Sequence, residues 1–265
     1  KCHQGVDRVP MADKLNKGRE LLENYGCYGC HKIEGWQHHS KPGPSLTKIS
    51  GKVSKEWIKN WIWSPKSFNP NSKMPSFFNQ LNNSSSEFKA KNMAEVNAMA
   101  EYIHRTSKDY KPFQKFTGGN ADTGKELIET VGCVGCHMVE GIDDKWNNLK
   151  QKKGTYLTGI GSKVDPDWLV SWLKKPSHYQ EDTVMPSFRL TDKEANDIAT
   201  YLLSLKNKQF AELEFPEINK KIRDEILVQD YFSAFETVDA AKNKLAKMTD
   251  DARTMELAKR SINKY

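Results

Sequence analysis

The sequence has no long apolar run. Its 265 residues contain no stretch of about 18 consecutive apolar residues, the length that predicts a membrane-spanning helix, and only 37% of them are hydrophobic. Such low hydrophobic content is expected if a large buried prosthetic group fills part of each core. Cysteine is also scarce, with five residues, four of which lie in two short motifs. The chain begins at Lys1 without a methionine or an apolar leader, which predicts a processed or partial product.

The two cysteine motifs are nearly identical. Residues 26–31 read GCYGCH and residues 132–137 read GCVGCH. In C-x-x-C-H, the cysteines at i and i+3 and the histidine at i+4 fall on one face of a helical turn, a spacing typical of covalent attachment of c-type haem. A zinc ribbon would need its two cysteine pairs about 15–20 residues apart. The pairs begin at Cys27 and Cys133, so the spacing favours haem over zinc.

The motifs belong to a longer internal repeat, because residues 43–77 and 154–188 align without a gap. Shared positions include Gly43, Lys52, Val53, Trp57, Trp61, Pro65, Met74 and Pro75, which recur as Gly154, Lys163, Val164, Trp168, Trp172, Pro176, Met185 and Pro186. A helix is expected before each motif, and an aromatic closing helix ends each repeat. The two tryptophans of each pair are one helical turn apart and so present one aromatic face. That face either packs on a haem, with an indole N–H toward a propionate, or belongs to the ordinary core.

Met74 and Met185 are the candidates for the second axial ligand of each iron, opposite His31 and His137. Each precedes a proline, which biases its backbone to an extended conformation and can hold a thioether out of a loop. Both stand at the same offset within the repeat. The competing side chains are Met93, Met99, His38, His39 and His104 in the first repeat and Met138 and His178 in the second. His/Met ligation raises the reduction potential relative to more basic ligands.

A loop carbonyl is expected to fix each proximal imidazole from behind. In the first repeat this carbonyl would belong to Pro44, and in the second it would belong to Thr155. Near the start of the chain, Cys2-His3 is either the end of a third C-x-x-C-H motif or a lone thiol beside a histidine.

The order of helix, C-x-x-C-H, glycine-bearing loop, tryptophan helix, Met-Pro and closing aromatic helix resembles class I c-type cytochromes. It is similar to the tandem diheme or multihaem members that serve as electron-transfer subunits of bacterial respiratory complexes. The resemblance implies an all-α fold of two tandem domains, two haem c groups, with a third if Cys2 and His3 belong to one, and a periplasmic or equivalent compartment. It assigns haem attachment to Cys27, Cys30, Cys133 and Cys136, and iron ligation to His31, Met74, His137 and Met185.

The expected organisation has five parts. They are an N-terminal segment (1–11), a first cytochrome domain (12–110), a linker (111–122), a second cytochrome domain (123–206) and a charged helical tail (207–265). The N-terminal segment could be the remnant of a further haem site. The tail could lead into a further haem domain.

One-electron transfer between a respiratory donor and an acceptor is the leading functional hypothesis. A diheme cytochrome c peroxidase is the alternative from the enzyme class, and it needs one iron with an open or displaceable ligand. A docking role for the tail in a larger redox complex is compatible with the first hypothesis. The net charge of +7 favours acidic protein partners, whereas no nucleic-acid-binding signature accompanies it. The lysines that suggest a basic face are Lys32, Lys41, Lys48, Lys52, Lys55, Lys59, Lys66 and Lys73.

Overall fold

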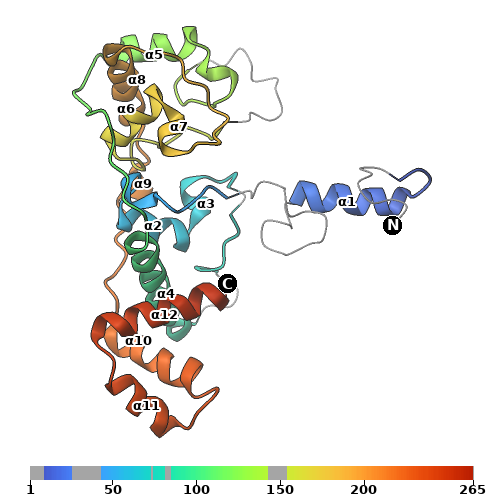
Figure 1. Ribbon diagram of the computed structural model, residues 1–265, viewed down its shortest axis with the longest axis vertical. Coiled ribbons are helices and arrows are strands. Elements are labelled where there is room, and N and C mark those ends of the chain that lie inside the picture. Colours follow the sequence, from blue (N-terminus) through green and yellow to red (C-terminus); the bar gives the residue numbers. More distant parts are fainter. Residues whose placement is uncertain (1–8, 26–42, 73, 81–84, 143–153, 265) are drawn as a thin grey trace. The chain divides into compact units, whose positions relative to one another are not determined.

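The computed structural model describes residues 9–25, 43–72, 74–80, 85–142 and 154–264. The chain divides into two compact units, Lys1–Ser45 and Leu46–Tyr265, and each is described by itself. The residues drawn as a grey trace in Figure 1 lie outside the description.

The described part of the first unit contains helix α1, Asp13–Tyr25. The Asn16 side chain accepts a hydrogen bond from the Val9 N–H at 2.8 Å and donates one to the Val9 carbonyl at 2.7 Å. These bonds tie the preceding chain to the first turn, and Lys17 pairs with Glu20 across the next turn at 2.9 Å. The helix predicted before the first motif is therefore confirmed.

The described part of the second unit contains helices and no strands, and 57% of the structure is helix. An antiparallel bridge joins Ile160 to Lys206. The elements in chain order are η2 (Ile49–Gly51), α2 (Lys55–Trp63), α3 (Pro65–Phe68), α4 (Ser86–Arg105), α5 (Ala121–Thr130), η3 (Cys133–Gly135), α6 (Pro166–Lys174), α7 (Pro176–Tyr179), α8 (Asp192–Ser204), α9 (Lys208–Ala211), α10 (Lys220–Ile226), the π-helix η4 (Leu227–Phe232), α11 (Val238–Ala246) and α12 (Asp250–Lys264). The predicted all-α fold is confirmed.

The sequence repeat is repeated in three dimensions as α2, α3, α4 and α6, α7, α8 (Figure 1). The tryptophan helices begin alike: Ser54 accepts from the Trp57 N–H at 3.1 Å, and Asp165 accepts from the Trp168 N–H at 2.9 Å. Such caps satisfy N–H groups that have no partner within the helix. A proline then starts the short helices α3 and α7.

Each tryptophan helix carries one stacked indole pair. The ring centres are 5.1 Å apart for Trp57 and Trp61 and 5.3 Å apart for Trp168 and Trp172, with an interplanar angle of 16° in both pairs. The aromatic face predicted from the spacing is therefore confirmed. The first member of each pair is buried and the second is half-buried.

The core of the second repeat forms where α5 packs against α8. Gly124 of α5 is buried, and a Cβ there would collide with the backbone of Asp197 in α8. Ile128, one turn further along α5, is 1% exposed. A glycine at this crossing therefore lets the two helix backbones approach closely.

A segment that we call strap 2, residues 110–120, lies along the second repeat. Its backbone N–H groups bond to side chains of α6 and α8, with Gln114 to Ser171 at 3.0 Å, Phe116 to Asp167 at 2.8 Å, Thr117 to Asn196 at 2.8 Å and Asn120 to Asp197 at 2.7 Å. The segment predicted as a linker, 111–122, is thus hydrogen-bonded to the second repeat through four of its residues.

A matching segment, strap 1, residues 210–219, lies along the first repeat. Asn60 of α2 donates to the Leu213 carbonyl at 2.9 Å, and Asn97 of α4 donates to the Pro216 carbonyl at 2.9 Å. These two asparagines stand where Ser171 and Asn196 stand in the second repeat. Each strap begins with an aromatic ring, since Phe210 packs on Phe68 and Tyr110 packs on Tyr179, both with ring centres 4.9 Å apart.

The tail folds onto α4 of the first repeat, through α12 and α10 in particular. Their shared core contains Ala94 and Ala98 of α4, Leu257 and Ala258 of α12, and Ile226, Leu227, Val228 and Phe232 of α10 and η4. Buried Glu95 of α4 accepts from the Tyr231 hydroxyl at 3.0 Å and pairs with Lys264 at 3.2 Å. Burial, reinforced by Glu95, raises the pKa of Tyr231 to about 12, so the phenol stays protonated and donates.

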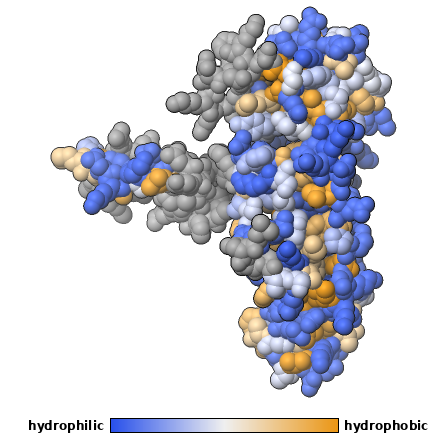
Figure 2. Space-filling view, turned by 180° about the vertical axis from the view of Figure 1, so that it is seen from behind, coloured by the Kyte–Doolittle hydropathy of each residue, from blue (hydrophilic) through white to orange (hydrophobic). Residues whose placement is uncertain are grey.

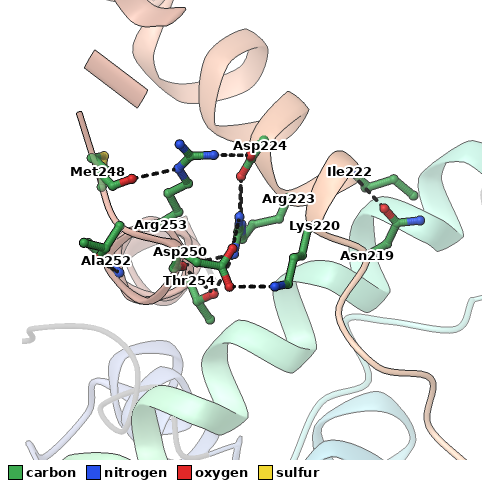
Figure 3. A network of polar contacts seen from close by, with 11 residues as sticks. Asn219, Lys220, Ile222, Arg223, Asp224, Met248, Asp250, Ala252, Arg253 and Thr254 are labelled. Atoms are coloured by element: carbon green, nitrogen blue, oxygen red, sulfur yellow. Dashed lines mark hydrogen bonds and ion pairs between the residues drawn. The ribbon is translucent and has the colours of Figure 1, made fainter. Parts of the chain in front are cut away.

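Within the tail, a buried arginine joins α10 to the start of α12 (Figure 3). Arg223 is 1% exposed and pairs with Asp224 at 2.7 Å and Asp250 at 2.8 Å, and it donates to Thr254 at 3.0 Å. Arg253 adds a second bond to Asp224 at 2.6 Å. Because a buried guanidinium needs charged partners, this network fixes how the tail helices pack.

Among the described residues, no helix is long and apolar enough to cross a membrane. The face shown in Figure 2 is mostly hydrophilic, with smaller hydrophobic patches.

Candidate haem-binding sites

The second C-x-x-C-H motif forms one tight helical turn. Gly132 precedes it with φ +93°, a conformation that favours glycine. The Cys136 and His137 N–H groups both bond to the Cys133 carbonyl, at 3.1 Å and 2.9 Å. The helical turn expected from the spacing is therefore present. Cys136 is exposed, whereas Cys133 is half-buried against the core of the second repeat, and burial raises the pKa of its thiol.

A loop carbonyl holds the Nδ1 side of the His137 imidazole, as the sequence predicts. Its Nδ1 lies 2.7 Å from the Thr155 carbonyl oxygen. Because a carbonyl only accepts, Nδ1 carries the proton and Nε2 keeps its lone pair for a metal. A Cβ on Gly154 would lie 2.6 Å from the imidazole ring, so a glycine is required beside the histidine. This contact explains why the position equivalent to Gly43 is again glycine.

Met185 lies in a loop held by hydrogen bonds to the side chains of Thr183 and Trp172. Its N–H bonds to the Thr183 hydroxyl at 3.2 Å, and its sulfur accepts from the Trp172 indole N–H at 2.9 Å. The sulfur-bearing side chain and Cys133 both pack against the core of the second repeat. The Met74 loop repeats this design, with the Met74 N–H bonded to the Ser72 hydroxyl at 3.1 Å.

A family comparison identifies this arrangement. A model of the cytochrome c family matches residues 15–107 and again residues 121–206. The chain belongs to the cytochrome c family. Searches of curated proteins and of solved structures gave no significant match. The two matches correspond to the two repeats, which are called the first and second cytochrome c domains below. Membership of this family implies covalently bound haem c and supports haem over zinc as the group held by the motifs.

The buried polar groups of the cytochrome c domains fit a haem. The indole Nε1 atoms of Trp57 and Trp168 are buried, and neither has a hydrogen-bond partner among the described residues. A buried donor without an acceptor costs about 1–3 kcal/mol. Haem propionates are acceptors of the required kind, and they would meet the same atom in both domains. These donors fit a haem in each domain, and the Nε2 lone pair of His137 fits an iron in the second.

The remaining candidate residues divide between described and undescribed parts of the chain. Cys2, His3, Cys27, Cys30 and His31 lie outside the described residues, as do the competing ligands His38 and His39. Met74 is half-buried. Among the other competitors, Met99 is buried beside Phe78 and Val96, and His178 packs on Tyr110 and Phe113. Met138 is 37% exposed, and Met93 and His104 are half-buried in or near α4.

Two features of the sites were missed by sequence reasoning. The bond from Trp172 to Met185 joins two residues that the repeat had singled out separately. A signal for it was present, because the methionine follows its tryptophan pair at the same distance in both repeats. The straps were missed as well, although the sequence holds a signal for them. The asparagines that bond to the straps, Asn97 and Asn196, stand at matching places in the two repeats. So do Asn120 and Asn219, which begin the helix after each strap.

The predicted basic face is smaller than the sequence suggested. Lys59 is buried, Lys55 pairs with Glu101 at 2.9 Å, and Lys52 points into the contact between the two domains. Lys32, Lys41 and Lys73 lie outside the described residues.

Proposed function

We propose that the chain is a diheme electron-transfer protein whose two haems are both ligated by histidine and methionine. Two cytochrome c domains support haem-based electron transfer, and a c-type haem supplies a one-electron Fe(III)/Fe(II) couple. Cys27 and Cys30 would attach one haem and Cys133 and Cys136 the other. The iron ligands would be His31 with Met74, and His137 with Met185.

The observation that carries this proposal is the pair of matching methionine loops. In both domains a hydroxyl two residues upstream holds the methionine N–H, and in the second domain an indole holds the sulfur. A sulfur held in this way is already positioned before it binds an iron. Since two loops of the same design favour two filled sixth positions, the structure supports electron transfer over peroxide chemistry.

The protein's own residues would set the potential and protect the site. Thr155 fixes the tautomer of His137 and makes it a better donor. The neutral sulfur of Met185 raises the reduction potential relative to a more basic ligand. The stacked indole pairs place one buried ring in the core of each domain.

The setting of the protein belongs to the same proposal. We place it in the periplasm or an equivalent extracytoplasmic compartment, between a respiratory donor and an acceptor with acidic docking surfaces. The resemblance to multihaem subunits and the net charge of +7 support this setting. Membership of a larger redox complex, in which the tail docks, and a third haem at Cys2 and His3 are further parts of it.

The test is an optical spectrum of the purified protein with pyridine haemochrome quantification per chain. Two low-spin c-type haems are expected, with the weak methionine band of the oxidised form and no change on adding peroxide or carbon monoxide. Met74→Ala and Met185→Ala should each remove half of that band, whereas Met138→Leu should leave it intact. A high-spin component that binds peroxide in the unaltered protein would overturn the proposal in favour of a peroxidase. Three haems per chain would assign Cys2 and His3 to a further site.

A further inference from the structure

Two lysines at matching places in the repeat cross between the domains. Lys52 of the first domain lies over the second domain's indoles, with its Nζ 4.4 Å from the ring centre of Trp168 and 5.9 Å from that of Trp172. Lys163 of the second domain lies over the first domain's indoles, with its Nζ 4.9 Å from Trp57 and 5.7 Å from Trp61. Each tryptophan pair therefore receives its cation from the other domain.

Backbone contacts hold this exchange in place. The Asp165 N–H bonds to the Lys52 carbonyl at 2.8 Å, which joins the segments that carry the two lysines. Beside it, Lys48 donates to the Tyr179 carbonyl at 3.1 Å, and the Tyr179 hydroxyl donates to the Lys48 carbonyl at 3.2 Å. The Asp165–Lys52 bond joins two backbone groups, so it does not depend on the lysine side chains.

The two ammonium groups lie where an anionic partner would stabilise their charge. Burial, with the charge of Lys163, lowers the pKa of Lys52 to about 7, and burial lowers the pKa of Lys163 to about 8. No carboxylate within the described part of the chain pairs with either lysine. The indole N–H groups of Trp57 and Trp168 beside them also have no acceptor there. Two half-buried lysine side chains and two buried indole donors gather at one contact, and the described residues offer them no anionic partner.

We propose that Lys52 and Lys163 are positioning residues for the haem of the opposite domain, where each binds the propionate carboxylates together with the neighbouring tryptophan N–H. This inference rests on the proposed function, because it requires a haem in each domain. A cation that neutralises propionates raises the reduction potential of the haem that carries them. It follows that the potential of each haem is set partly by a residue of the other domain.

The first test follows the indole N–H resonances of the reduced diheme protein by ¹H–¹⁵N NMR. Trp57→Phe and Trp168→Phe variants assign the two resonances. Lys163→Gln should shift the Trp57 resonance and leave that of Trp168 in place, and Lys52→Gln should do the reverse. If each variant instead shifts the indole of its own domain, or neither resonance moves, the crossed assignment is wrong. This readout does not depend on which residues ligate the irons.

The second test measures the two reduction potentials separately. Met74→His is expected to lower the potential of the first domain's haem, so that the remaining high-potential step belongs to the second domain. In that background, Lys52→Gln should raise the oxidised-to-reduced ratio of the remaining haem about tenfold at a fixed potential, and Lys163→Gln should change it less than about twofold. In the Met185→His background the two lysine variants should exchange their effects.

Matched variants separate the crossed contact from a general loss of charge. Lys52→Arg and Lys163→Arg keep the charge and should restore most of the potential. Lys175→Gln, at an exposed lysine of the second domain, removes a charge without touching either indole pair and should have little effect. Equal effects of Lys52→Gln on both haems would overturn the proposal. If Met74→His and Met185→His leave both potentials unchanged, the ligand assignment of the proposed function fails, and the indole test still decides the crossing.

Discussion

The closing helices of the two domains, α4 and α8, are covered by different parts of the chain. α8 is crossed by α5, the helix that leads into the motif of the same domain, through the close contact at Gly124. α4 is crossed by α12, from the far end of the tail, through Leu257 and Ala258. The straps differ in the same way, since strap 2 precedes its domain in sequence and strap 1 follows both domains. Two similar sequences can thus have their closing helices covered by different segments, one that comes earlier in the chain and one that comes later.

The largest expected effect on stability comes from removing Phe210, the aromatic ring with which strap 1 begins. Phe210 is 1% exposed and touches Trp57 and Phe68. Phe210→Ala should destabilise the first domain by about 3–5 kcal/mol, the usual cost of deleting a buried phenylalanine. Hydrogen exchange followed by mass spectrometry should show the loss in peptides of α2 and α4 and not in those of α8.

The control for this change is Phe235→Ala, because Phe235 is 85% exposed and its loss should cost little. Equal loss of protection in α4 and α8 after Phe210→Ala would mean that the tail supports the whole second unit rather than the first domain.

A change of intermediate size acts at the α5–α8 crossing. Gly124→Ala would push a methyl group into the backbone of Asp197 and should destabilise the second domain by about 1–3 kcal/mol. Glu126→Ala is the control on the same helix, because the Glu126 side chain is exposed. Chemical denaturation of the two variants measures the difference, and a neutral Gly124→Ala would show that the helices can separate without cost.

The strap asparagines offer a smaller and symmetrical test. Asn97→Ala should weaken the first domain and Asn196→Ala the second, each by about 1 kcal/mol, the typical net worth of a hydrogen bond. Hydrogen exchange at strap 1 and strap 2 distinguishes the two effects. If either variant loosens both straps equally, the straps are not independent parts of their own domains.

The smallest effect is the pH dependence that Asp197 gives to the second domain. The bond from Lys193, with that from the Asn120 N–H, holds the pKa of Asp197 below its ordinary value of 3.8. The carboxylate therefore stabilises the folded state above that value, and this contribution is lost as the pH falls toward the lowered pKa. Ala98 occupies the corresponding place in α4, so the first domain has no carboxylate at this position.

Unfolding measurements of the unaltered protein and Asp197→Asn between pH 7 and pH 3 test this dependence. The difference in stability between the two should shrink as the pH falls. A difference that stays constant would show that the charge of Asp197 contributes nothing.

Local features of both domains could be predicted from the sequence. The helix before each motif, the stacked indoles and the loop behind His137 all follow from spacing within about 35 residues, over which short-range geometry restricts the chain strongly. The repeat also marked Lys52 and Lys163 as equivalent. It could not show that they exchange domains, because this depends on how two separate domains pack. The position of α12 on α4 was hidden for the same reason, since many apolar helix faces have nearly equal affinity for one another.

Because α8 is covered by an earlier segment and α4 by a later one, the two domains are completed in a particular order during synthesis. The second domain has its strap, its α5 and its α8 once residue 206 has been made. In the first domain, Ala94 and Ala98 remain without their partners until Leu257 and Ala258 follow, more than 150 residues later. The N-terminal domain is therefore the last to finish, against the usual order in which domains fold from the ribosome. Until the tail has been made, the face of α4 that carries Ala94 and Ala98 lacks its cover.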